Sequence, residues 1–167
     1  KALMAYPRVT YVDSLLARAI LAVLTQITVS AVVLGGIFAT QDIVIILDMV
    51  PVLKAYGLVI LLALGVGVFN SYASYAFPLY KMFWNTAKSP LILVSAVFYI
   101  FEDLPRNVQS LLWFNPLVHI VGLLRQGFYA SYEPTYISIT YVCVWGVVPL
   151  FFGVLLLRRF SRDILYK

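Results

Sequence analysis

Four side chains are the ones whose chemistry would first suggest a reactive site: His119, Cys143, Glu102 and Asp103. A histidine acts in catalysis only with a nucleophile, a metal or a proton partner nearby, and the sequence supplies none at a recognisable spacing. Glu102 and Asp103 are adjacent and so face apart on a helix, and Cys143 stands in an apolar run typical of a packing residue. We expect no catalytic, cofactor-binding or metal site in this chain, and a structural role for His119.

The composition places the chain in lipid. Of its 167 residues 63% are hydrophobic and 11% are charged, and the mean hydropathy is +0.96. Soluble domains carry about 25% charged residues, so a globule of this composition would expose large apolar patches to water. A soluble enzyme, a disordered tail and a nucleic-acid-binding module are excluded, and no nucleic-acid partner is expected. The single cysteine also excludes an internal disulfide.

Gaps between charged residues predict the membrane spans. Three charge-free stretches exceed the ~20 residues that cross a bilayer as a helix, and they predict spans at 19–40, 55–78 and 137–157. A shorter gap, with Pro90 in a first helical turn, predicts a fourth span at 87–104. The expected fold is therefore an all-α integral membrane protein with four spans, in a single and partial transmembrane domain.

The segment 105–132 does not read as a fifth span, because Asn107, Gln109, Asn115, Pro116 and His119 interrupt it. We expect a short helix, a sharp turn at Asn115-Pro116, and a second helix that ends near Arg125 and Tyr129. Two interpretations stay open. The pair is an amphipathic surface element in an aromatic belt, or it is a re-entrant gate over an exit path.

The distribution of basic residues predicts the orientation, because positive residues accumulate on the cytoplasmic side of membrane proteins. Four crossings put nine of the 12 Lys and Arg residues on one side and three on the other. The segment 1–18 and the tail 158–167 are then both cytoplasmic, and 105–132 lies outside. A fifth crossing would move the basic tail to the wrong side.

The interiors of the predicted spans contain no Asp, Glu, His or Lys, whereas transporters driven by ion gradients usually keep one there. If the chain moves a substrate, we expect a partner polypeptide to supply the energy. Ala63, Gly67 and Ser71 form a small-residue stripe that favours close helix packing, within the chain or between copies. Phe69, Tyr72 and Tyr80 share a narrow arc that suits stacking on sugar rings, although an inner aromatic belt explains them equally well.

Several stretches resemble permeases of the ABC-2 type that export bacterial capsular polysaccharide. The segment Tyr6-Pro7-Arg8-Val9-Thr10-Tyr11-Val12-Asp13-Ser14-Leu15-Leu16-Ala17-Arg18-Ala19 is similar to the one that follows their coupling helix. Trp113-Phe114-Asn115-Pro116-Leu117-Val118-His119 and Leu124-Arg125-Gln126-Gly127-Phe128-Tyr129 resemble their outer re-entrant element, and Arg158-Arg159-Phe160 resembles their C-terminus.

The resemblance implies a six-helix permease that forms a homodimer and pairs with a separate ATPase, which binds ATP and Mg. The four spans would be the third to sixth, so we expect the chain to be the C-terminal portion of such a permease in the bacterial inner membrane. The cargo would be a lipid-linked polysaccharide. Rival functions are an ABC-2 permease for O-antigen, teichoic acid or a drug, and a membrane scaffold subunit without transport.

The resemblance also implies roles for individual residues. Tyr6, Pro7, Asp13 and Arg18 would form a coupling segment, although Asp13 also suits a helix N-cap and Arg18 a membrane-interface anchor. Phe69, Tyr72 and Tyr80 would line a substrate path. The outer gate would consist of Trp113, Asn115, Pro116, His119, Arg125 and Tyr129.

Overall fold

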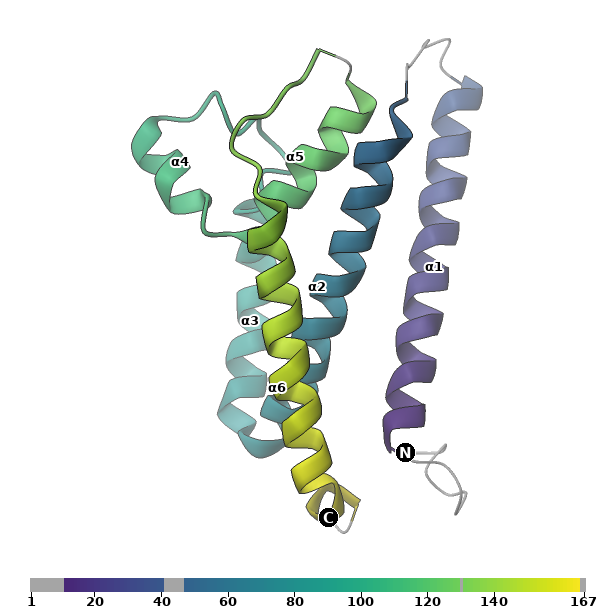
Figure 1. Cartoon of the computed structure of the whole chain (residues 1–167), viewed down its shortest axis with the longest axis vertical. Coiled ribbons are helices and arrows are strands. Elements are labelled where there is room, and N and C mark those ends of the chain that lie inside the picture. Colours follow the sequence, from purple (N-terminus) through teal and green to yellow (C-terminus); the bar gives the residue numbers. More distant parts are fainter. Residues whose placement is uncertain (1–10, 41–46, 130, 166–167) are drawn as a thin grey trace. The chain divides into compact units, whose positions relative to one another are not determined.

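The computed structural model describes residues 11–40, 47–129 and 131–165, and the regular structure in these ranges is entirely helical (Figure 1). The helices are α1 (Tyr11–Thr40), α2 (Met49–Ala76), α3 (Pro78–Leu93), α4 (Arg106–Leu112), α5 (Pro116–Phe128) and α6 (Ile139–Leu165). By length and composition three segments could each cross a membrane: Leu15–Thr40, Met49–Ala76 and Ile139–Arg159. The all-α prediction is confirmed for the described residues, and three of the four predicted spans fall on these helices.

The chain divides into two compact units, Lys1–Val44 and Ile45–Lys167. The first unit consists of α1, whose long charge-free run matches the predicted span at 19–40. Three threonine hydroxyls along it, those of Thr25, Thr28 and Thr40, donate to backbone carbonyls four residues earlier and so need no external partner. Asp13 lies inside the first turn of α1 rather than at its N-cap, where a carboxylate interacts favourably with the helix dipole.

In the second unit α2 is the central element and contacts α3, α5 and α6. It begins at an N-cap, Asp48, whose side chain accepts a hydrogen bond from the N–H of Val50 at 3.0 Å. The core between α2, α5 and α6 contains Ala55, Leu58, Leu62, Ile120, Leu123 and Val142.

Glycines let α2 and α6 approach closely. A Cβ on Gly65 would overlap the carbonyl oxygen of Gly146, and one on Gly153 would lie 2.8 Å from the backbone N of Phe69. Such approach at small residues is how helices associate in a membrane. The predicted stripe of Ala63, Gly67 and Ser71 is not the surface that packs on α6. Around the Cβ position of Gly67 the described residues place no atom within 4 Å.

The predicted span at 87–104 has different bounds in the structure. The helix in this region, α3, begins nine residues earlier at Pro78 and ends at Leu93, so Pro90 lies inside it rather than in its first turn. Beyond Leu93 the chain forms the 94–105 connector, in which Ala96 adopts a left-handed conformation with φ of 59°. Ala96 is buried with Phe101, Leu112 and Val118, so tertiary packing ends the helix here. The number of membrane crossings stays a prediction.

A single extended residue, Phe77, separates α2 from α3, and Pro78 begins α3 with a φ already suited to a first turn. The two helices therefore run antiparallel and in contact (Figure 1). The connector, α4, α5 and the loop to α6 gather at the opposite end of the helices from Phe77 (Figure 1).

Candidate functional site at the connector end

The turn between α4 and α5 matches the predicted helix, Asn-Pro break and second helix. The side chain of Asn115 caps α5 by accepting from the N–H of Leu117 at 3.0 Å, and Pro116 occupies the first helical position, where its missing N–H costs nothing. Asn115 also donates from Nδ2 to the carbonyl of Val94 at 3.1 Å. One side chain thus starts α5 and attaches it to the connector.

Arg125, near the C-terminal end of α5, holds the same connector at two further points. Its Nη1 donates to the carbonyl of Tyr99 at 2.7 Å and its Nη2 to that of Val97 at 3.0 Å. The side-chain amide of Gln109 on α4 donates to the carbonyls of Glu102 and Leu104, at 3.1 and 2.8 Å. Irregular backbone near a membrane needs such partners, because its carbonyls are not satisfied by a helix.

His119 lies fully buried at the centre of this end. Its Nδ1 accepts from the backbone N–H of Ser138 at 3.3 Å, which assigns the ring proton to Nε2, 2.9 Å from the carbonyl of Trp113. Burial lowers the pKa of His119, and its hydrogen bonds to backbone carbonyls offset this in part. The neutral ring joins α5 to the turn before it and to the segment before α6.

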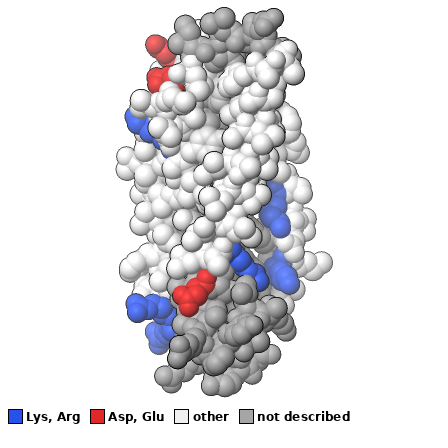
Figure 2. Space-filling model, turned by 90° about the vertical axis from the view of Figure 1, so that its right-hand side faces the viewer, with Lys and Arg blue, Asp and Glu red and all other residues white. Residues whose placement is uncertain are grey.

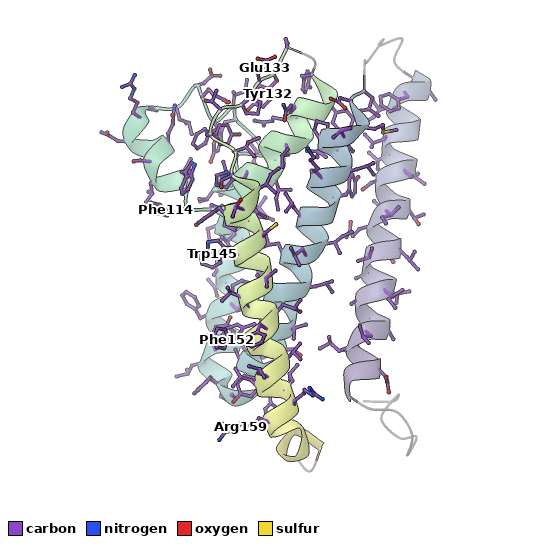
Figure 3. All side chains as sticks on the ribbon, in the orientation of Figure 1. Phe114, Tyr132, Glu133, Trp145, Phe152 and Arg159 are labelled. Atoms are coloured by element: carbon purple, nitrogen blue, oxygen red, sulfur yellow. The ribbon has the colours of Figure 1, made fainter. Side chains whose placement is uncertain are left out.

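Aromatic rings surround His119. The ring of Trp113 meets it edge-on with centroids 5.2 Å apart, and Tyr141 of α6 lies at 5.4 Å. The indole N–H of Trp113 donates to the carbonyl of Tyr136 at 3.0 Å, and the hydroxyl of Tyr141 donates to the carbonyl of Phe114 at 2.7 Å. These bonds fix the Asn-Pro turn against the start of α6, beside which Phe114 lies in Figure 3.

A second polar cluster closes the end around Tyr136. The hydroxyl of Tyr132 donates to Glu102 Oε2 at 2.9 Å and lies 3.2 Å from the hydroxyl of Tyr136. Tyr136 stacks on the buried Phe101 with centroids 4.1 Å apart, and its hydroxyl occupies the space that a side chain at Gly122 would need. Burial raises the pKa of both tyrosines, so they remain protonated donors at neutral pH.

The structure therefore brings five of the six predicted gate residues to the connector end: Trp113, Asn115, Pro116, His119 and Arg125. All of these except Pro116 form hydrogen bonds there. Tyr129 is the C-cap of α5, and its side chain is largely exposed. Sequence reasoning missed Gln109, Tyr136 and Tyr141, and it missed that the partners of Asn115 and Arg125 are backbone carbonyls. Carbonyl partners leave no mark in residue types, so no sequence signal could have identified them.

The predicted path residues lie near the Phe77 turn. Phe69 and Tyr72 of α2 and Tyr80 of α3 are each half-buried. The hydroxyl of Tyr80 donates to Oδ1 of Asn70, and its ring stacks parallel to Trp84 with centroids 6.3 Å apart. Tyr80 therefore joins the two helices of the hairpin, whatever else it contacts. A role for these rings in a substrate path stays a prediction.

Two of the predicted coupling residues, Tyr6 and Pro7, lie outside the described residues. Asp13 and Arg18 are on α1 and exposed.

Among the described residues no group of three or more His, Cys, Asp and Glu side chains could hold a metal ion. The connector end is a hydrogen-bonded cap with exposed apolar side chains such as Phe114, Leu111 and Phe98. A gate role for this end stays a prediction.

Comparison with known proteins agrees with the resemblance inferred from the sequence. The chain is similar to bacterial inner-membrane proteins of capsule polysaccharide export. It is 28% identical over 153 residues to the polysialic acid transport protein KpsM of Escherichia coli, a match that covers 92% of this chain and 59% of that protein. No protein-family model matches the chain.

Two further relatives extend the similarity over almost the whole chain. The capsule polysaccharide export inner-membrane protein CtrC of Neisseria meningitidis serogroup B is 26% identical over 162 residues. The protein of the same description, BexB, from Haemophilus influenzae is 26% identical over 168 residues. Each match covers 97% of this chain and 61% of the relative. The chain thus spans about three fifths of the length of these relatives.

Proposed function

We propose that this chain is part of the membrane permease of an ATP-driven, ABC-2 type exporter that moves capsular or related polysaccharide outward across the bacterial inner membrane. The observation that carries the proposal is the similarity, over 92% to 97% of the chain, to proteins named for capsule polysaccharide export and polysialic acid transport. The apolar helices, three of which are long enough to cross a membrane, support a membrane subunit.

The proposal gives the chain no bond chemistry of its own. ATP and Mg bind a separate ATPase subunit, and two copies of the permease form the transport unit with two copies of that ATPase. The proposal keeps the orientation predicted from the basic residues of the whole sequence, in which the connector end faces outward. In that orientation Glu133 lies on the outer side and Arg159, at the other end of α6, lies on the cytoplasmic side (Figure 3). Both ends of this segment are then cytoplasmic.

The first test is copurification. The full-length chromosomal product carries a C-terminal tag, is extracted gently from membranes, and its stoichiometric partners are identified by mass spectrometry. We expect a subunit with a Walker phosphate loop. If a control ABC complex survives the same extraction and no nucleotide-binding partner is found, the ATP-driven function is wrong and the scaffold function takes its place.

The second test distinguishes export of polysaccharide from export of drugs and from a scaffold role without transport. In the reconstituted complex, ATP hydrolysis should respond to a glycan and not to hydrophobic drugs. Replacing Phe69 and Tyr72 by alanine should reduce export of polysaccharide while the complex still inserts and assembles. A scaffold subunit would tolerate these changes, and a drug exporter would respond to the opposite class of compound. Tyr80 is left intact in this variant because it also joins α2 to α3.

A further inference from the structure

Helix α3 carries three different faces. One face, with the half-buried Tyr80, Trp84 and Leu91, lies against α2, and no residue of α3 is fully buried. A second face is apolar and exposed, with Leu79, Met82 and Phe83. The third is polar and exposed, and at ~100° per residue it forms one stripe: Lys81, Asn85, Lys88 and Ser89.

The polar stripe extends deep along the hairpin. Lys88 is the eleventh residue of α3, which places it about 15 Å from the helix start. Because α2 and α3 are antiparallel and separated only by Phe77, Lys88 lies about level with Val66 in the apolar run of α2, a helix long enough to cross a membrane. Figure 2 shows Lys and Arg surface partway along the visible face as well as nearer its ends.

The expectation that the span interiors hold no titratable residue depends on where this helix begins, and α3 begins at Pro78, so that both lysines lie within it. The expectation followed from starting the helix at residue 87, which left Lys81 in a loop and Lys88 at a helix end. A charged residue at such depth faces water, protein or a bound ion rather than lipid, because its desolvation in hydrocarbon is costly. None of the four stripe side chains has a hydrogen bond or ion pair within the described part of the chain.

We propose that the stripe Lys81–Asn85–Lys88–Ser89 is an anion-binding face of the transport path, and that its occupant is an acidic glycan. This inference rests on the proposed function. Two cations about 10 Å apart along the helix suit a polymer with repeated negative groups, and the amide and hydroxyl between and beside them suit sugar hydroxyls. α3 contains no Asp or Glu to neutralise the lysines.

A second copy of the chain is a poorer occupant. In the second unit the carboxylates whose side chains are described, Asp48, Glu102, Asp103 and Glu133, lie at the connector end, away from the level of Lys88. A parallel copy would bring its own lysines to this depth and no matching anion. A lipid headgroup would have to leave the interface to reach Lys88. A glycan that is being transported passes every level of its path, including the level of Lys88.

The first experiment measures the electrostatic environment of the stripe without requiring transport. In a Cys143→Ala background, Asn85→Cys and, as the matched lipid-facing control, Met82→Cys are treated with anionic and cationic water-soluble thiol reagents of equal size. We expect the Asn85→Cys variant to react, and roughly threefold or more faster with the anionic reagent, a preference lost on adding Lys88→Gln. The Met82→Cys variant should hardly react. Equal inertness of both positions would overturn the proposal.

The second experiment identifies the occupant in the full permease–ATPase complex, held in nanodiscs of zwitterionic lipid. A labelled acidic oligosaccharide should bind and protect the Asn85→Cys variant, while a neutral oligosaccharide of equal length should not. Lys88→Gln should weaken binding about tenfold, Lys88→Arg should restore it, and Lys54→Gln, at the other end of α2, should leave it unchanged.

The outcomes separate the alternatives. Protection by phosphatidylglycerol but not by the oligosaccharide would replace the glycan by a lipid and overturn the proposal. Glycan export that proceeds equally in the Lys88→Gln variant would overturn the proposal and leave the exporter function standing. A complex that exports no glycan, acidic or neutral, would instead show that the proposed function itself is wrong.

Discussion

Arg125 on α5 donates a hydrogen bond of 2.7 Å to the backbone carbonyl of Tyr99, 26 residues earlier in the chain. This bond, with its companion to Val97, is what allows the 94–105 connector to leave the helical conformation while its carbonyls remain satisfied. The sequence predicts Arg125 as a gate residue, and in the structure its side chain stabilises the irregular backbone of the connector.

Replacing Arg125 by methionine should destabilise the protein by about 2–3 kcal/mol, because two carbonyls lose a charged donor. The thermal unfolding midpoint of the purified protein in detergent measures the change. Arg106→Met on the exposed face of α4 is the matched control and should stay near the wild type. Equal effects of the two substitutions would show that the charge of this end matters and the carbonyl contacts do not.

Replacing Asn115 by alanine removes the cap of α5 and the donor to Val94 together. A lost N-cap costs about 1 kcal/mol and an unpaired carbonyl about as much, so we expect a total near 2 kcal/mol. Asn107→Ala on the exposed side of α4 serves as the control. Thermal unfolding checks both variants, and an unchanged midpoint for Asn115→Ala would contradict the structure.

Two glycines on α2 should respond in opposite ways to alanine. Gly65→Ala would force the added methyl into the carbonyl of Gly146, and overpacking of this kind costs at least about 1–3 kcal/mol. Gly67→Ala meets open space and should be neutral or stabilising by up to about 1 kcal/mol, since alanine favours a helix. Unfolding midpoints and yield in the membrane fraction distinguish the two. A tolerated Gly65→Ala would rule out the close approach of α2 and α6.

The stability of the protein should fall as the pH is lowered below about 6.5, the ordinary pKa of histidine. The pKa of His119 is lower in the folded protein because the ring is buried, so between these values the unfolded chain binds the extra proton. This contribution to stability is therefore fully present above the pKa that histidine has in the unfolded chain. It is lost as the pH falls toward the lower pKa that His119 has in the folded protein. The titratable groups with rings against His119 are Tyr136 and Tyr141, and burial raises the pKa of Tyr136, so that it stays protonated in this range.

Thermal unfolding between pH 7.5 and pH 5 measures how stability depends on pH. Because the chain has one histidine, a histidine titration can be assigned directly to His119. A His119→Gln variant keeps polar atoms but cannot titrate. It should be less stable than the wild type at pH 7.5 and nearly independent of pH in the same range. A slope that persists in the variant would assign the titration to the carboxylates instead.

The amino-acid sequence by itself predicted the membrane environment, the helical fold class and the break at Asn115-Pro116. Charge-free apolar stretches of about 20 residues or more favour membrane-spanning helices, in which the backbone groups are satisfied within the segment. Asn115 followed by Pro116 predicted a cap and a first helical turn, because both effects are local to the backbone of those residues. The predicted arc of Phe69, Tyr72 and Tyr80 on one helix is wrong, because the extended Phe77 ends α2 and places Tyr80 on α3. The short similar segments came from residue types alone.

Tertiary structure alone decided where α3 begins and ends, and therefore which residues share its depth. The helix stops at Leu93 because Ala96 and Phe101 pack on α4 and α5, and because Asn115, Arg125 and Gln109 satisfy the carbonyls that follow. Those contacts join residues from 5 to 26 positions apart, so no local pattern contains them. The same shift moved Lys88 from a predicted helix boundary into α3, where it lies about level with Val66 of α2.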